Sequence, residues 1–225
     1  MIKVILTDIE GTTSSLSFVK EVLFPYARAH LAEYVQQHRD EPVVKAQLDA
    51  VRHEVGAAMD ESQVIEQLHR WIDEDRKITP LKLLQGMIWE AGYRGGELRG
   101  HVYEDAARRL RDWHQAGVRL YVFSSGSVQA QKLLFGHSDA GDLAPLFSGY
   151  FDTRTGAKRD PEAYWTIAKA IGADPEEVLF LSDRREELDA AREAGMNTVW
   201  LVREQAPNPA AEHTQVSDFH SIKIS

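Results

Sequence analysis

Short apolar runs alternate with amphipathic segments in the second half of this chain, and one more apolar run lies near its start. The apolar runs predict strands at residues 4–6, 118–123, 147–151, 178–181 and 198–202. Apolar positions at helical spacing predict helices at residues 128–135, 161–171 and 186–194. Strands that alternate with helices of about 10 to 15 residues form parallel sheets with right-handed connections. We therefore expect an α/β fold with a parallel sheet flanked by helices.

Between the first and second predicted strands the pattern is helical. Apolar spacing predicts helices at residues 24–37, 43–59, 63–72, 81–91 and 104–115. We expect an all-helical domain at residues 18–111, inserted into a core made of residues 1–17 and 112–225. The glycine-rich residues 92–100 lack the spacing of a phosphate-binding loop. They are predicted to form the flexible return from the insert, with a substrate-facing loop as the alternative.

The C-terminal part of the chain breaks the alternation. From Glu204 onward, Pro207 and Pro209 favour a surface excursion. Phe219 and Ile222 are apolar enough to pack back onto the body of the protein.

Composition is that of an ordinary globular protein. The chain has 225 residues, of which 43% are hydrophobic, so it can bury one good core and a second, smaller unit. No stretch approaches the roughly 18 apolar residues that span a bilayer, and the N-terminus lacks the pattern of a signal peptide. Cysteine is absent, which excludes disulfides and thiolate metal sites. We expect a cytosolic protein with no membrane partner.

The net charge of −9 argues against a nucleic-acid partner, because such proteins present a basic face to the phosphate backbone. The same acidity would repel a phosphorylated substrate. A phosphate ester could bind only where a bound cation and a few placed lysines or arginines reverse the field locally.

The first predicted strand ends in two carboxylates and a glycine, Asp8, Glu10 and Gly11. Ligands of open α/β sheets bind beyond the carboxyl ends of the strands, which makes Asp8 the first catalytic candidate. A carboxylate can attack phosphorus and form an aspartyl-phosphate, and an acid two residues later can protonate the leaving oxygen and then activate water. The alternative is a polar turn, in which Asp and Gly are common.

Three further polar segments follow other predicted strands or loops; together with the pair Asp8 and Glu10 they are called stations here. Ser124 and Ser125 open a strand-to-helix turn that suits an anion, although serine is also an ordinary helix cap there. Lys158 precedes a helix and could neutralise phosphate and Asp8, or could simply be solvated. Asp183 ends another buried strand and, beside Asp8, would offer Mg²⁺ its sparse oxygen ligands. Glu187 lies one helical turn later. It could belong to a solvated helix face, or it could support the metal indirectly by contacting a metal ligand.

These stations, in this order, resemble the haloacid dehalogenase (HAD) superfamily, whose sheet is Rossmannoid and whose C1 cap is a helical insert between the first and second stations. Within it, the closer resemblance is to the acireductone synthases, the enolase-phosphatase family of methionine salvage. That resemblance is carried by Asp-Ile-Glu-Gly-Thr-Thr at 8–13, Phe-Val-Lys at 18–20, Leu-Phe-Pro-Tyr at 23–26, Ser-Ser-Gly-Ser-Val-x-Ala-Gln-Lys-Leu-Leu-Phe-Gly-His-Ser at 124–138 and Phe-Asp-Thr at 151–153.

The resemblance implies a Mg²⁺-dependent enzyme that enolises and then dephosphorylates 2,3-diketo-5-methylthiopentyl-1-phosphate, a small phosphorylated diketone. The product would be 1,2-dihydroxy-3-keto-5-methylthiopentene, and the enzyme would be a monomer. Carried over by position, Asp8 is nucleophile and metal ligand, Asp183 is a metal ligand, and Glu10 serves the metal and proton transfer. Ser124, Ser125 and Lys158 would bind the substrate phosphate.

One position departs from the wider superfamily, whose phosphatases usually carry Asp where this chain has Glu10. The longer side chain could suit proton abstraction from carbon as well as transfer to oxygen, which is a hypothesis. Three alternatives stay open: a phosphatase of another small metabolite, a metal-free dehalogenase, and a catalytically silent binding module. The acid at position 10 argues against the dehalogenase, since halide departure needs no proton.

Several other residues have two interpretations. The aromatic and Met side chains of the insert could contact the methylthio group or form its core; they are Trp71, Met87, Trp89 and Tyr93. His101 and His137 are expected to be structural, and the nine histidines show no metal-binding spacing.

Overall fold

The protein is described by a computed structural model over residues 1–203 and 208–224. Contacts divide the chain into two compact units, one of Met1–Leu16 with Arg99–Ser225 and one of Ser17–Leu98. The second boundary differs from the expected position at residues 111 and 112. The reason is helix α6 (Glu104–Gln115), whose apolar face packs on strand β2 (Arg119–Phe123) and so joins the sheet unit.

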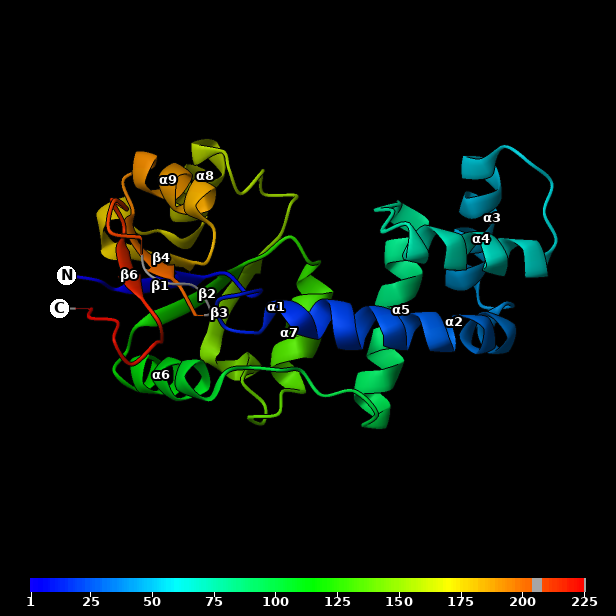
Figure 1. The fold of residues 1–225 in the computed structure, drawn as a ribbon, viewed down its shortest axis with the longest axis horizontal. Coiled ribbons are helices and arrows are strands. Elements are labelled where there is room, and N and C mark those ends of the chain that lie inside the picture. Colours follow the sequence, from blue (N-terminus) through cyan, green and yellow to red (C-terminus); the bar gives the residue numbers. More distant parts are fainter. Residues whose placement is uncertain (204–207, 225) are drawn as a thin grey trace. The chain divides into compact units, whose positions relative to one another are not determined.

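The first unit contains a parallel sheet, which confirms the predicted fold class (Figure 1). In the described residues its strand order is β3-β2-β1-β4-β5-β6. Besides β2, the strands are β1 (Val4–Thr7), β3 (Phe147–Phe151), β4 (Val178–Ser182), β5 (Asn197–Leu201) and β6 (Thr214–Val216). Strand β6 was not predicted, because three residues with one apolar side chain give no periodic signal; it pairs with β5 at the sheet edge.

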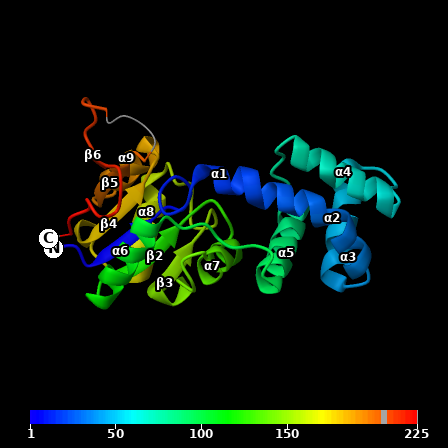
Figure 2. The ribbon, with the colours of Figure 1, turned by 60° about the horizontal axis from the view of Figure 1, so that its bottom comes forward.

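Helices cover both faces of this sheet. Helices α8 (Pro161–Ile171) and α9 (Arg185–Glu193) lie on one face, while α6 and α7 (Val128–Gly136) lie on the other (Figures 1 and 2). Short 3₁₀ turns at Ala144–Leu146 and Pro175–Glu177 precede β3 and β4. Apolar side chains of α8 and α9 pack on β1, β2 and β4 in one buried core, which includes Leu6, Phe123, Tyr164, Phe180 and Leu188.

The order of the strands reverses direction at β1. Connections from β1 to β2 and β3 move toward one edge of the sheet, whereas those to β4 and β5 move toward the other. The first strand is hydrogen-bonded to both β2 and β4, and the register pairs Thr7 with Val122 and with Leu181. In open parallel sheets such a switch point, at the carboxyl ends of the strands, is where ligands bind.

The second unit is built from helices. They are α1 (Leu16–Phe18), a π-helical segment (Val19–Leu23), α2 (Phe24–His38), α3 (Pro42–Val55), α4 (Glu61–Asp73) and α5 (Thr79–Gly95). The π-segment lies just before Pro25, which has no N–H to donate to the carbonyl four residues back. Phe24 N–H bonds to Val19 O, five residues back, which is the π-helical spacing.

Glycines explain two differences from the predicted helices of this unit. Helix α3 ends at Val55 rather than near residue 59, because Gly56 takes a left-handed conformation at its C-cap. Helix α5 continues to Gly95, so the prediction of a loop from residue 92 was wrong there. Glycine occupies position 92 of this helix because of close packing: a Cβ there would lie 2.6 Å from Tyr26 Oη.

The core of the helical unit contains the aromatic residues whose role the sequence left open. Trp71 is buried, and Met87 and Trp89 are partly buried against the same cluster. Tyr93 is also buried. The indole Nε1 of Trp89 donates a hydrogen bond to Leu23 O. Packing within the unit therefore accounts for these side chains.

The C-terminal segment packs as expected where it is described. Phe219 and Ile222 are buried, whereas Pro209 is exposed. The expected surface excursion at residues 204–207 lies outside the described residues. In the part of the chain that the structure describes, no helix has the length and apolar character needed to cross a bilayer.

Arg203 joins the C-terminal segment to the turn after β1. Its guanidinium donates to both carboxylate oxygens of Asp105 and, through Nε, to Thr12 O at 2.9 Å. The same guanidinium lies 3.8 Å from the centroid of the Tyr103 ring, and Asp105 also accepts a hydrogen bond from Phe219 N. A planar group with several fixed donors suits this position, and lysine could not reproduce it.

We predict that Arg203→Met lowers the free energy of unfolding by about 3 to 5 kcal/mol, because it leaves the largely buried Asp105 carboxylate without its charge partner. Urea unfolding followed by circular dichroism would measure the change. The matched control is Arg108→Met on α6, whose ion pair with Glu104 is exposed and should contribute below about 1 kcal/mol. Equal losses in the two variants would contradict the prediction.

Candidate active site

Asp8 is the first residue beyond β1, and the sheet itself holds its backbone. Asp8 N donates to Leu181 O of β4 at 2.9 Å, while its own carbonyl accepts from the hydroxyls of Thr7 and Thr13. The residue is buried, at 5% exposure. Asp8 therefore sits at the switch point with little freedom.

The chain after Asp8 turns tightly. Ile9 O accepts hydrogen bonds from the amides of residues 12, 13 and 14, and Gly11 N donates to Ser14 O. Gly11 has φ +72°, and a Cβ there would lie 2.4 Å from Asp183 Oδ2. Glycine is required for two reasons, the left-handed backbone and the close approach of the Asp183 carboxylate. Glu10 is half-buried in this turn and forms an isolated bridge with Ser14.

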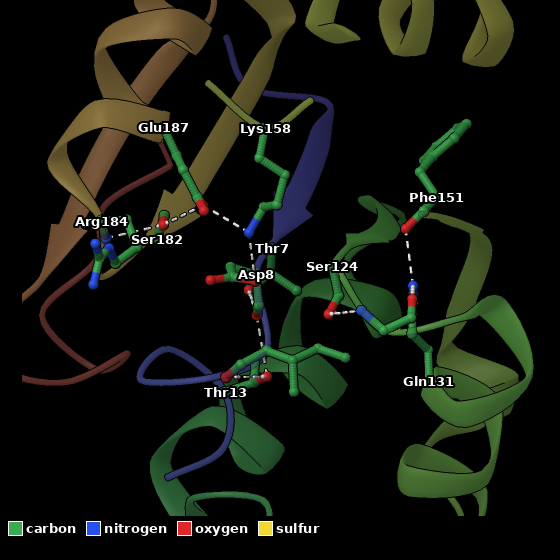
Figure 3. Close-up of polar contacts among 12 residues, drawn as sticks. Thr7, Asp8, Thr13, Ser124, Gln131, Phe151, Lys158, Ser182, Arg184 and Glu187 are labelled. Atoms are coloured by element: carbon green, nitrogen blue, oxygen red, sulfur yellow. Dashed lines mark hydrogen bonds and ion pairs between the residues drawn. The ribbon is translucent and has the colours of Figure 1, made fainter. Parts of the chain in front are cut away.

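Lys158 reaches into the same region from the loop between β3 and α8. Its Nζ lies 2.7 Å from Asp8 Oδ1 and 2.6 Å from Glu187 Oε2 (Figure 3). All three side chains are largely buried. The backbone of this lysine is also held, because the Tyr164 hydroxyl donates to Lys158 O at 2.7 Å.

Glu187 belongs to this cluster, so its interpretation as a solvated helix face was wrong. Its carboxylate accepts a hydrogen bond from Ser182 Oγ at 2.9 Å, and Ser182 Oγ accepts one from Arg184 N. Exposed charges at residues 184–186 had suggested a solvated segment. The first turn of α9 instead directs Glu187 toward Lys158.

Negative charge is crowded at this edge of the sheet. Burial, together with the charges of Asp8 and Glu187, raises the pKa of Asp183 to about 7. Burial and the Asp8 charge also raise the pKa of Glu187. Burial alone would lower the pKa of Lys158, but the two carboxylates outweigh it and hold that pKa above its usual value. The ammonium is thus kept charged between acids.

Beyond the end of β2 lies a loop of serines, here called the serine loop (residues 124–127). Ser124 is buried, and its Oγ accepts a hydrogen bond from Gly126 N at 3.2 Å. Ser125 is exposed, and Ser127 caps helix α7 by accepting from Ala130 N. Hydroxyls and amides at a helix N-terminus make this loop suited to an anion.

The structure places the predicted residues at adjacent strand ends. Asp8 and Asp183 follow β1 and β4, Ser124 and Ser125 follow β2, and Lys158 enters from the loop after β3. Sequence reasoning missed Ser182, Thr13 and Tyr164, whose hydroxyls hold other site residues. The two histidines that were expected to be structural both make hydrogen bonds with the backbone of other residues: His101 Nδ1 accepts from Ser15 N, and the carbonyl of His137 accepts from Gly100 N.

Comparison with known proteins identifies the relatives of this chain. The family model of haloacid dehalogenase-like hydrolases matches residues 2–195. The chain is 61% identical over 224 residues to a protein of Methylococcus capsulatus named Enolase-phosphatase E1, covering 99% of this chain and 98% of that one. It is 62% identical to the protein of the same name from Pseudomonas aeruginosa, with 99% of each covered.

A solved structure shares both fold and sequence. The UTR4 protein of Saccharomyces cerevisiae superposes with a TM-score of 0.85 at 37% identity, over 99% of this chain and 100% of that one. The similarity therefore extends over the sheet unit and the helical unit, through every station of the site. The chain belongs to the haloacid dehalogenase-like hydrolases and, among them, to the Enolase-phosphatase E1 family.

Proposed function

We propose that this protein is an enolase-phosphatase that converts 2,3-diketo-5-methylthiopentyl-1-phosphate into 1,2-dihydroxy-3-keto-5-methylthiopentene and phosphate. The observation that carries the proposal is the full-length identity with proteins named Enolase-phosphatase E1. The geometry supports the phosphatase half directly, since a buried carboxylate, a buried ammonium and an anion-binding loop converge at one edge of the sheet.

In the phosphatase step, Asp8 is the proposed nucleophile. A carboxylate oxygen forms a bond to phosphorus while the bond from phosphorus to the substrate oxygen breaks. Glu10 gives the departing oxygen its proton, then takes one from the water that hydrolyses the aspartyl-phosphate. Hydrolysis regenerates Asp8 and releases phosphate. The hydrogen bond of Asp8 N to β4 and the contact with Lys158 support this role, because they fix the carboxylate before substrate arrives.

Lys158 and the serine loop are proposed to bind the phosphate. The lysine pairs with Asp8 and stays charged, so it can offset the negative charge that grows as phosphorus is attacked. Ser124 Oγ already accepts from Gly126 N and has its own proton to donate. Ser125, exposed at the same turn, adds a second hydroxyl.

Enolisation moves a proton from carbon to a carbonyl oxygen. Glu10 is the proposed participant, since its side chain is one methylene longer than the usual aspartate of the superfamily. The longer reach supports abstraction of a proton from C1, the carbon that bears the phosphate, while the carbonyl oxygen on C2 gains a proton and the double bond forms between C1 and C2.

The residues of the site fit a divalent cation such as Mg²⁺. Asp183 is partly buried beside Asp8 and Glu187 and has no ion pair among the described residues. In the same residues no group of three or more His, Cys, Asp or Glu is arranged to hold a metal. Two carboxylates with water and phosphate oxygens are the ligands Mg²⁺ accepts. When bound, the ion would neutralise charge on the transferred phosphate, and its proposed ligands are the carboxylates of Asp8 and Asp183 and the backbone carbonyl of Glu10.

The helical unit is proposed to be the C1 cap of the family. Its formation of a compact unit between β1 and α6 supports this proposal. Monomeric state and cytoplasmic location stay predictions.

The proposed reaction predicts two separable signals. In anaerobic turnover of the diketo phosphate with Mg²⁺, the wild type should show enol absorbance followed by phosphate release. Asp8→Asn should stop before phosphate release, because an amide cannot form the aspartyl-phosphate. Phosphate release from unrelated esters with no enol signal would refute the enolase half and favour a phosphatase of another metabolite.

Metal binding predicts opposite effects of one substitution. Asp183→Asn should raise the melting temperature of the metal-free protein, because it removes one of the crowded carboxylates. It should also abolish most of the increase that Mg²⁺ produces in the wild type. Differential scanning calorimetry with and without Mg²⁺ would test both. Asp112→Asn, at an exposed position of α6, is the control; an unaltered Mg²⁺ effect in Asp183→Asn would exclude this ligand.

The close packing of Gly11 against Asp183 predicts a site-specific loss. Gly11→Ala should reduce phosphate release about a hundredfold, because its Cβ must displace the Asp183 carboxylate. The control is Gly117→Ala, since Gly117 has φ +82° and no atom within 4 Å of an added Cβ. Both variants carry the strain of alanine at positive φ. Equal losses of phosphate release in the two variants would therefore show that the strain, and not the contact with Asp183, reduces activity.

A further inference from the structure

Gln131 packs beneath the serine loop in the protein interior and contacts the loop through its side-chain amide. This residue of α7 is buried, at 2% exposure. Its Nε2 donates to Gly126 O at 2.8 Å and to Phe151 O at 2.9 Å (Figure 3). Phe151 O also accepts from Ser124 N at 3.1 Å. One side chain therefore ties the serine loop to the end of β3.

This contact orients the peptide groups of the serine loop. In a trans peptide the carbonyl and the following N–H point in opposite directions. Because Gly126 O is turned toward Gln131, the N–H of Ser127 is turned away from it. Gly126 N is likewise turned to Ser124 Oγ. An anion entering the loop then meets N–H and O–H groups, and the Gly126 carbonyl, which would repel it, stays withdrawn.

The chemistry of the residue fits donation rather than simple packing. A primary amide has two N–H donors, and here both reach carbonyl oxygens. The other end of the same amide, Oε1, is buried and has no hydrogen-bond partner within the described residues. A buried acceptor without a partner is unfavourable, so an apolar side chain would pack better at this position. The two donated hydrogen bonds explain why glutamine occupies it.

We propose that Gln131 is a positioning residue that sets the phosphate affinity of the serine loop. The inference rests on the proposed function in one respect, that the loop receives the substrate phosphate. It concerns the loop alone, because Gln131 contacts the ends of β2 and β3, whereas the proposed metal ligands follow β1 and β4.

The test measures binding of inorganic phosphate by calorimetry in the presence of Mg²⁺. Gln131→Met keeps the length of the side chain and removes both donors, while Gln131→Glu keeps its shape and places carboxylate oxygens against two carbonyls. We expect Gln131→Met to weaken phosphate binding about tenfold, from loss of about one net hydrogen bond, and Gln131→Glu to weaken it more. The increase in melting temperature caused by Mg²⁺ alone should stay as in the wild type.

The matched control is Gln115→Met, the same substitution at an exposed position at the end of α6, which lies before the start of β2, whereas the serine loop follows the end of that strand. It should leave both phosphate and Mg²⁺ binding unchanged. Wild-type phosphate affinity in either folded Gln131 variant would overturn the inference. So would equal losses of phosphate and Mg²⁺ binding, which would show a general disturbance, or a wild type that does not bind phosphate.

The outcome is independent of the substrate. If phosphate binding depends on Gln131 as expected but the diketo phosphate gives no enol, the proposed function fails and the positioning role stands. If enol and phosphate appear in sequence but Gln131→Met binds phosphate normally, only the positioning role is lost.

Discussion

The ammonium group of Lys158 holds the candidate site together, because it lies between two buried carboxylates that would otherwise repel each other. Its contacts with Asp8 and Glu187 are short and largely shielded from water. Buried charges are tolerated only when they are paired and hydrogen-bonded. Tyr164 and Ser182 supply the additional hydrogen bonds, to the lysine backbone and to the glutamate. Removing the lysine would leave three acids at one sheet edge.

The parallel sheet makes this crowding possible. Adjacent β1 and β4 are each followed by an aspartate, and the hydrogen bond from Asp8 N to Leu181 O extends the ladder to the proposed nucleophile. Gly11 then lets the turn come within contact of Asp183. Rigid strand ends hold like charges closer than flexible loops would. Burial and the nearby charges of Asp8 and Glu187 together raise the pKa of Asp183. A site of this kind is prepared for a cation.

Much of this arrangement could be predicted from the sequence because strand ends are readable. The apolar runs alone place Asp8, Ser124 and Asp183 at the carboxyl ends of strands in an α/β sheet. Glu187 was misread, since the run of charges at 184–187 hides which residue of the first helical turn faces inward. Gln131 had a signal that was overlooked: it lies one helical turn before the buried Leu134 and Phe135, a position where a polar side chain is unusual. Arg203 gave no local signal, because its partners lie about 100 and 190 residues away.

The residues on the two sides of Asp8 make it possible in different ways for a phosphate to bind to an acidic protein. The chain is acidic overall, and the side toward β4 is more acidic still, so a phosphate could not approach without a cation there. On the side toward β2, the serine loop carries no ionised side chain and offers oriented hydroxyl and amide dipoles instead. Fixed dipoles attract an anion without adding positive charge that would pair with Asp8. A second lysine in that loop would compete for Asp8, whereas neutral donors held by Gln131 leave the Asp8 carboxylate available for its proposed attack on phosphorus.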